Sequence, residues 1–324
     1  MDARQFSGYD LIGDVHGCYD ALVELLHKLG YHKQQGRYVS ADPRRPRQLL
    51  FLGDLLDRGP GIRESVQLVY ELVEQGQAQI VMGNHEYDAL AWNTPAPPGT
   101  GRSHLREHNR HNSRIIQQTL EQFANHPSDW RDLMAWLERM PLVLELAHFR
   151  VVHACWDQRL IDELRSRYPD ARMNRELLMA SADKHQFAGR LIDRLTRGVD
   201  LVLPDGMQMR SRDGLTRQRF RAKYWVSRPA NYGDLEFQPD PLPDDVAQRP
   251  VSEADRAALP YYSLDAPLLF VGHYWQSGKP RRLRRNMACL DYSAVKAGRL
   301  VAYRLDDESE LDNEKFVWVD GIKH

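Results

Sequence analysis

Cysteine is scarce in this sequence and shows no pairing pattern. The three cysteines, Cys18, Cys155 and Cys289, are far apart, odd in number and without a C-x-x-C spacing. A disulfide-rich secreted domain and a zinc finger are therefore excluded, and we expect free thiols in a reducing compartment. Residues 1–5 also lack the basic-then-apolar pattern of an export signal, so we expect a cytoplasmic protein.

Long hydrophobic runs are absent as well, although 42% of the residues are hydrophobic. No stretch approaches the roughly 20 apolar residues of a membrane helix, so we expect no membrane partner. The formal net charge of −1 argues against a surface that coats nucleic acid as a whole. No G-x-G-x-x-G follows the first expected strand, which excludes a Rossmann dehydrogenase.

What the sequence does contain is one construction repeated three times: an apolar run, a glycine and then polar side chains. The runs are residues 9–13, 48–53 and 79–83, and the side chains that follow them are Asp14 and His16, then Asp54, Asp57 and Arg58, then Asn84, His85 and Glu86. Two later apolar runs, 149–152 and 267–272, end directly before His153 and His273. Five such endings in one chain indicate a functional site at strand ends.

Between the early runs, apolar residues recur with the helical period. Leucines 22, 25, 26 and 29 share one helix face, and so do Ile62, Val66, Val69 and Val73. Alternating strands and helices predict an α/β fold in which ligands bind at the carboxyl ends of the strands. We expect one domain over residues 1–324.

The remainder of the chain is less regular. We expect a lid-like insertion near residues 94–140, with a solvated connector as the alternative for His104, His108 and His111, and with helices at 113–124 and 130–140. Residues 170–197 are expected to be helical, residues 201–203 a strand and 204–206 a turn. A surface segment is expected near 205–262, with a linker at 238–250. The β-like runs 286–291, 300–305 and 315–319 are expected to complete a second sheet.

The side chains at the strand ends form a donor set for metal ions. Carboxylate, amide oxygen and imidazole together suit manganese, iron or zinc better than calcium or magnesium. Six ligands exceed one tetrahedral shell, so we expect two divalent ions, with manganese preferred. The predicted ligands are Asp14, His16, Asp54, Asn84, His153 and His273.

Three further residues suit phosphoryl chemistry beside such ions. Arg58 has the forked guanidinium that binds two phosphate oxygens. His85 is placed to protonate a leaving oxygen, and Asp57 is the natural partner for that imidazole. We therefore predict His85, Asp57 and Arg58 as catalytic residues, with Arg58 and Asn84 also contacting substrate.

These motifs resemble the signature motifs of the phosphoprotein-phosphatase (PPP) superfamily of metallophosphoesterases. The resemblance rests on residues 13–17, 53–59 and 83–86, with His153 and His273 resembling the two later ligand histidines. It implies that Asp14 and His16 bind the first metal, that Asp54 bridges, and that Asn84, His153 and His273 bind the second. It also implies a fold of two mixed β-sheets sandwiched between helices, and direct attack on phosphorus by a metal-bridged hydroxide.

Within that superfamily, residues 9–31 and 49–61 resemble the bacterial bis(5′-nucleosyl)-tetraphosphatases most closely. The Asp57-Arg58 and His85-Glu86 pairs instead resemble the serine/threonine protein phosphatases, and His153-Ala-Cys155 stands where the family usually has His-Ala-Gly. The first resemblance makes a dinucleoside polyphosphate the preferred substrate. The second leaves a phosphoprotein, or a broad range of phosphomonoesters, as the alternative. An inactive relative that binds nucleotide or nucleic acid is a further alternative.

Several arginines are candidates for a second phosphate contact. The family has one between the two later histidines, and Arg197, Arg221 and Arg228 all qualify by position. Two basic runs, at residues 210–223 and 279–285, are either solvated faces or a cationic rim for a polyphosphate or nucleic acid. Trp156 and Trp275 are expected to pack, or to stack a nucleobase.

Overall fold

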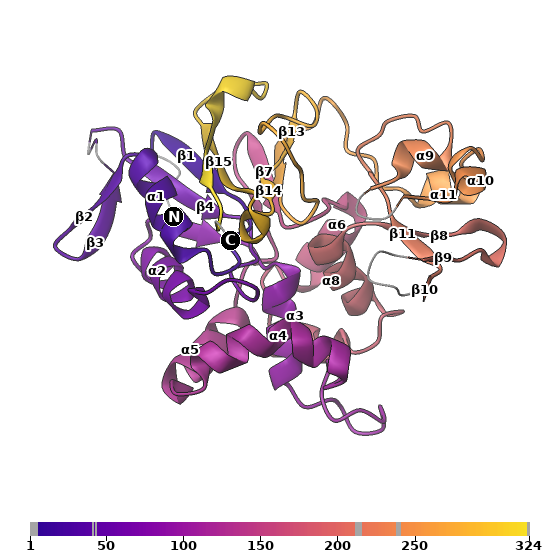
Figure 1. Ribbon diagram of the computed structural model, residues 1–324, viewed down its shortest axis with the longest axis horizontal. Helices are drawn as coiled ribbons and strands as arrows, with labels where there is room; N and C mark the ends of the chain where they lie inside the picture. Colours follow the sequence, from indigo (N-terminus) through magenta and orange to yellow (C-terminus); the bar gives the residue numbers. More distant parts are fainter. Residues whose placement is uncertain (1–5, 41, 43, 211–215, 238–240, 323–324) are drawn as a thin grey trace.

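Two mixed β-sheets pack against each other and carry helices on their outer faces in the computed structural model (Figure 1). The structure describes residues 6–40, 42, 44–210, 216–237 and 241–322. Residues 1–5, on which the expectation about export rests, Arg212 of the first basic run, and residues 238–240 of the expected linker lie outside these ranges. The α/β class predicted from the sequence is confirmed.

The first sheet has the order β14-β15-β1-β4-β5, and β16 also pairs with β15. Its strands are β1 (Gly8–Ile12), β4 (Arg47–Phe51), β5 (Ala78–Ile80), β14 (Asp291–Tyr292), β15 (Arg299–Leu305) and β16 (Phe316–Asp320). The strands β1, β4 and β5 are parallel, whereas β15 runs antiparallel to β1.

The second sheet has the order β13-β12-β7-β6. Its strands are β6 (Val143–Glu145), β7 (Phe149–Val152), β12 (Leu268–Val271) and β13 (Met287–Cys289). The strands β7, β12 and β13 are parallel, so the ends of β7 and β12 point the same way.

Side-chain alternation along the strands builds a core on each side of the first sheet. Leu50 and Leu52 of the β4 run pack in one buried cluster with Phe149 and Phe270 of the second sheet. Leu49 and Phe51, which alternate with these two leucines, belong to a second cluster that includes residues of the helices. Because successive residues of a strand point to opposite faces, this alternation separates the inter-sheet core from the core beneath the helices.

The prediction that the last three β-like runs complete the second sheet is wrong for most of them. Only β13 joins that sheet, and the chain then passes through Leu290 to the first sheet, where β14, β15 and β16 lie. Alternating apolar residues predict a strand with a buried face but do not specify the neighbouring strand, because pairing depends on residues far away in the sequence.

The two expected early helices are present as α1 (Tyr19–Lys28) and α2 (Ile62–Glu74). The helices that follow are α3 (Asn84–Asn93), α4 (Arg110–Phe123), α5 (Pro127–Leu137), α6 (Gln158–Arg167), α7 (Arg175–Ala180) and α8 (Phe187–Arg197). In the described ranges, none of the helices has the length and apolar character that a bilayer crossing requires.

The expected helical stretch over 170–197 is present only in part, because the structure has two helices there, α7 and α8, with a turn between them. A Cβ on Gly189, in the first turn of α8, would lie 2.3 Å from the carbonyl oxygen of Asp183. The loop after α7 therefore folds back tightly onto the start of α8. This contact between backbones leaves no periodic signal in the sequence.

Smaller elements extend from the sandwich. A hairpin of β2 (Tyr31–Gln34) and β3 (Arg37–Ser40), which we did not predict, projects at the left of Figure 1. The segment on the right contains the expected strand β8 (Asp200–Val202), the turn η1 (Pro204–Gly206), β9 (Met209–Arg210), β10 (Thr216–Arg217), β11 (Arg219–Arg221), α9 (Tyr232–Leu235), α10 (Asp244–Ala247) and α11 (Glu253–Ala258). The short 3-10 helices η2 (Ala294–Lys296) and η3 (Asn313–Lys315) flank β15.

Candidate active site

The ends of five strands, from both sheets, bring the predicted ligand residues together. Asp14 and His16 follow β1, Asp54 follows β4, Asn84 follows β5, and His153 and His273 follow β7 and β12. His153 Nε2 lies 3.3 Å from both Asp54 Oδ2 and Asn84 Oδ1. His273 Nδ1 lies 2.8 Å from Asn84 Oδ1, and its backbone N–H donates to Asp14 Oδ2.

Glycine is required where these loops approach one another. A Cβ on Gly272 would lie 2.1 Å from Asp14 Oδ1, and one on Gly83 would lie 2.3 Å from Asp54 Oδ1. Because side chains do not tolerate such contacts, the glycine that ends each strand allows the carboxylate of a neighbouring loop to come close. The glycines in the repeated sequence construction are thus explained by the packing of the site.

The backbone of the site adopts left-handed conformations at an unusual number of positions. Ten non-glycine residues in the described ranges have positive φ, and five of them are His16, Asp54, Asp57, Arg58 and His273. Each such conformation costs on the order of 1 kcal/mol or more and persists only where surrounding contacts impose it. Their concentration here marks these loops as functional.

Hydrogen bonds to the backbone orient two of the imidazoles. His16 Nδ1 lies 2.8 Å from the carbonyl oxygen of Leu56, and His153 Nδ1 lies 2.6 Å from that of Leu52. With Nδ1–H donating to these carbonyls, each ring presents its Nε2 atom to Asp54. Orientation of this kind is typical of metal-ligating histidines.

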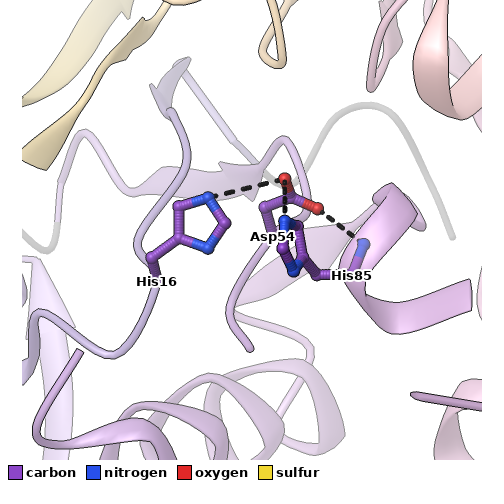
Figure 2. A group of neighbouring side chains, drawn as sticks. All are labelled: His16, Asp54 and His85. Carbon is purple, nitrogen blue, oxygen red and sulfur yellow. Dashed lines mark hydrogen bonds and ion pairs between the residues drawn. The ribbon is translucent and has the colours of Figure 1, made fainter. Parts of the chain in front are cut away.

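Asp54 is the common member of two potential metal-binding clusters. One contains His16, Asp54 and His85, and the other contains Asp54, His153 and His273; the ligand atoms in each lie within 4.8 Å of one another. Figure 2 shows His16 and His85 facing the carboxylate of Asp54, which also accepts the backbone N–H of His85. A carboxylate between two clusters is the arrangement expected of a bridging ligand.

The donor set of this site fits divalent cations. Asp14 Oδ1 is buried and has no hydrogen-bond partner among the described residues. Burial, and the negative charges of Asp291 and Asp54, raise the pKa of Asp14 well above its usual range. A buried, unpartnered oxygen among carboxylates is stabilised by a cation, and imidazole nitrogens beside it suit manganese, iron or zinc.

His85 and Asp57 form the expected acid pair. His85 Nδ1 lies 2.5 Å from Asp57 Oδ2. Burial opposes protonation of this imidazole, but the charge of Asp54 and the hydrogen bond to Asp57 outweigh burial and raise the pKa of His85. A protonated His85 is what a proton donor requires.

The guanidinium of Arg58 lies between two of these imidazoles. Its Nη1 donates to Nε2 of the neutral His16 at 2.9 Å, and its Nη2 lies 3.0 Å from His85 Nε2. The Arg58 residue itself is exposed, so its guanidinium is accessible to a phosphate. Burial and the charge of Arg58 lower the pKa of His16 well below its usual value, so His16 is kept neutral.

Sequence reasoning did not assign roles to three residues that support the site. Glu86 is fully buried, and its carboxylate accepts the backbone N–H groups of Gly83, Asp54, Leu55 and Leu56. Thr119 of α4 bonds Asp57, and the charge of the buried Asp291 acts on Asp14. For Glu86 a signal existed, since an acidic residue three positions after a helix N-cap often bonds the N-cap backbone.

The candidate arginines between the later histidines differ in their surroundings. Arg197 forms an ion pair with the buried Asp88 of α3. Arg221 lies over the ring of Tyr274 at 5.8 Å, and its charge is among those that lower the pKa of His273, after burial. Arg228 is exposed. Arg197 and Arg221 are therefore the two candidates beside the site.

The second basic run is mostly engaged with other parts of the chain. Arg285 pairs with Asp265 and Glu310, and Arg282 pairs with Glu310. Arg284 donates to the carbonyl oxygens of Trp225 and Tyr262. These arginines hold surface segments together, which argues against their forming a free cationic rim.

The remaining aromatic and histidine candidates divide between packing and surface positions. Trp156 is buried and Trp275 is half-buried, with its ring centroid 6.3 Å from that of Phe237. In the insertion, the ring of His108 stacks on Trp92 of α3 at 3.7 Å, and His104 stacks on His108 at 4.1 Å. Trp156 therefore packs, and these two histidines attach the segment after α3 to that helix.

The fold and the donor set together are those of the metallophosphoesterases. Residues 9–183, more than half of the 324 residues, match the calcineurin-like phosphoesterase family. The chain belongs to this family. The resemblance drawn from the motifs is confirmed.

One curated relative is similar over about a quarter of the chain. Over 77 residues, the chain is 51% identical to the bis(5′-nucleosyl)-tetraphosphatase PrpE [asymmetrical] of Halalkalibacterium halodurans, an alignment that covers 24% of this chain. The chain spans only about 30% of the length of this relative.

Two solved structures share the overall fold. A cold-active protein-tyrosine phosphatase from a psychrophilic Shewanella species matches with a TM-score of 0.52 and 17% identity, covering 92% of this chain and 75% of that one. A protein serine/threonine phosphatase from Saccharomyces cerevisiae matches with a TM-score of 0.52 and 14% identity, covering 100% and 82%. At these identities the likeness concerns the fold alone.

Proposed function

We propose that this protein is a hydrolase of phosphoester or phosphoanhydride bonds that uses two divalent ions, preferably manganese, with iron or zinc as alternatives. The observation that carries the proposal is the position of Asp54 between two imidazole-containing clusters, directly beside the His85–Asp57 pair. Asp14 and His16 would hold one ion, Asn84, His153 and His273 the other, and Asp54 both. Such a pair of ions activates water and neutralises phosphate charge when bound.

The chain's own side chains supply the remaining functions. Arg58 presents its guanidinium beside both clusters and is suited to bind two phosphate oxygens. Asn84 is suited to contact the same phosphate through its amide, and Arg197 or Arg221 to bind from the opposite side. His85, protonated and held by Asp57, donates a proton to the leaving oxygen.

For the substrate we propose a dinucleoside polyphosphate. The support is the 51% identity to a bis(5′-nucleosyl)-tetraphosphatase over a stretch of 77 residues. A serine/threonine phosphoprotein, or a range of phosphomonoesters, is the second candidate, which the Asp57-Arg58 and His85-Glu86 pairs favour. A cytoplasmic location agrees with such substrates. The remaining alternative is an inactive relative that binds nucleotide or nucleic acid.

The proposal is tested with purified protein loaded with Mn²⁺ and three substrates: nitrophenyl phosphate, a phosphoserine peptide and diadenosine tetraphosphate. We expect metal-dependent hydrolysis, with the highest kcat/KM for diadenosine tetraphosphate. Efficient turnover of the peptide without turnover of the dinucleotide would support the second candidate. Binding of metal without turnover of any of the three would support the inactive relative.

A further inference from the structure

A buried carboxylate on α3 binds two arginines from different parts of the chain. Asp88 follows Asn84 by four residues, so it lies on the same face of α3, about 6 Å further along the helix. Its Oδ1 accepts hydrogen bonds from Arg106 and from Arg197. Asp88 is only 6% exposed, which makes this a fixed attachment beside the proposed metal ligands.

Besides the ion pair with Asp88, a backbone hydrogen bond fixes the position of Arg106. It lies in the segment between α3 and α4, where its N–H donates to the carbonyl of Ala91, and the N–H of Leu105 donates to that of Thr94. The neighbouring Leu105 is buried against the core. The segment between α3 and α4 therefore holds one guanidinium at a defined place on α3, with the Arg106 side chain 20% exposed.

The cluster contains two guanidinium groups and one buried carboxylate. Two guanidinium groups share the single carboxylate of Asp88, and the only other acid paired with Arg197 in the described ranges is Asp193, at 3.7 Å and half exposed. Across the same ranges, the side chain of Arg106 donates to Asp88 alone. A guanidinium has five N–H donors, so most of those on Arg106 are available for an anion.

Arg106 also lies within electrostatic range of the acid pair. Burial lowers the pKa of Arg106 and Asp88 opposes this, while the positive charge of Arg197 lowers it further and Asp57 opposes it. The guanidinium is held by Asp88, one helical turn beyond Asn84. An anion bound there would therefore lie next to the phosphate that reacts and not in its place.

We propose that Arg106 binds the phosphate adjacent to the one that reacts, and that this contact selects polyphosphates over single phosphates. Asp88 is the positioning residue that holds Arg106 and Arg197 in register with the metal ligands. On this proposal, a single phosphate bound at Arg58 would have no second phosphate group for Arg106 to contact. The inference rests on the proposed function, because it names the substrate class of that same site.

The test compares two probes, orthophosphate and tripolyphosphate, as inhibitors of nitrophenyl phosphate hydrolysis by the Mn²⁺-loaded protein. The variants are Arg106→Gln and Arg106→Lys, and the matched control is Arg102→Gln, an exposed arginine of the same segment. We expect Arg106→Gln to weaken inhibition by tripolyphosphate ~10- to 100-fold, the usual range for a hydrogen bond between charged groups. Inhibition by orthophosphate should change less than about 3-fold, and Arg106→Lys should restore part of the loss.

Asp88→Asn separates a positioning role from a general structural one. Because Asp88 holds both Arg106 and Arg197, we expect Asp88→Asn to raise KM for diadenosine tetraphosphate more than KM for nitrophenyl phosphate. An equal rise of the two KM values would show that Asp88 merely supports the fold. Equal weakening of both inhibitors by Arg106→Gln, or weakening of neither, would overturn the proposal.

Failure of the proposed function can be distinguished from failure of this inference. The thermal midpoint of unfolding, measured with and without tripolyphosphate, reports binding without any turnover. If the protein hydrolyses nothing, the proposed function fails, but loss of the tripolyphosphate-induced increase in Tm in Arg106→Gln, and not in Arg102→Gln, would still support the role of Arg106. An undiminished increase in the Arg106 variants would overturn it.

Discussion

Thr119 and Asp57 are joined by two hydrogen bonds, although they are 62 residues apart in the sequence. The Thr119 hydroxyl donates to Asp57 Oδ1 at 2.5 Å and accepts the backbone N–H of Asp57 at 3.0 Å. Thr119 belongs to α4, within the insertion expected to be lid-like, and it is fully buried. Helix α4 therefore supports the acid pair through direct hydrogen bonds.

Replacing Thr119 by valine should weaken this support while preserving the shape of the side chain. The Asp57 N–H would be left unpaired in a buried position, which costs about 1–3 kcal/mol of stability. We expect kcat for a poor leaving group to fall ~10-fold and that for nitrophenyl phosphate to fall less. Thr119→Ser retains the hydroxyl and is the control. Equal kcat values in the valine variant and the wild type would contradict the role.

Removing the charge of Asp54 should affect both metal ions. Since Asp54 belongs to both clusters, we expect Asp54→Asn to abolish activity and to lower bound metal at both sites. His153→Ala should chiefly weaken one site, because His153 belongs to one cluster. Metal content after dialysis, measured by mass spectrometry, provides the comparison. Full occupancy with near-normal turnover in Asp54→Asn would rule out the bridging role.

Loss of the proton donor should depend on the leaving group. We expect His85→Asn to reduce kcat ~10²–10⁴-fold for alkyl phosphates, the usual contribution of general acid catalysis. Nitrophenolate leaves without protonation, so nitrophenyl phosphate should be affected less. Asp57→Asn should show the same pattern in milder form. If both substrate types lose equally, His85 is not the donor.

An ion-pair cluster at the other end of the first sheet predicts a pH dependence of stability. Burial alone would raise the pKa of Asp306, but hydrogen bonds from Lys315 and Arg47 outweigh it and lower the pKa to about 2. The folded pKa lies below the unfolded value of about 3.9, so the stabilisation is present above that value and is lost as pH falls towards 2.

Asp306→Asn should therefore destabilise the protein at pH 6, and the difference from wild type should shrink between about pH 4 and pH 2. Urea denaturation at several pH values measures this. Asp307→Asn, a change at the exposed neighbouring position, is the control and should show no such trend. A difference that stays constant down to pH 2 would contradict the assignment.

The strand ends could be predicted from the sequence because the informative residues are adjacent in it. Each of Asp14, Asp54 and Asn84 follows a glycine that ends an apolar run, so a local pattern indicated both the strand and its ligand. The helices α1 and α2 were likewise predicted from local periodicity, which reports one buried face.

The supporting residues could not be predicted in the same way. Thr119, Asp88 and Arg106 act through partners that only the folded chain brings near, and a threonine or an arginine in a polar helix or loop resembles a solvated residue. The arginines of residues 281–285 show the converse. Their charge suggested a binding rim, but Asp265 and Glu310, which pair with them, are distant in sequence.

The position of β15 beside β1 determines when the first sheet can finish folding. This strand lies beside β1, with Leu305 opposite Tyr9, so one side of β1 has no strand partner until the chain has been synthesised through residue 305. Pairing over such a sequence separation is slow, because a long loop must close before any contact forms. His273 lies on the same late part of the chain, and it completes the second ligand cluster. The second cluster is therefore complete only late in folding, whereas the first, formed by His16, Asp54 and His85, needs no residue beyond position 85. A nascent chain that ends before β12 would carry the first cluster without the second.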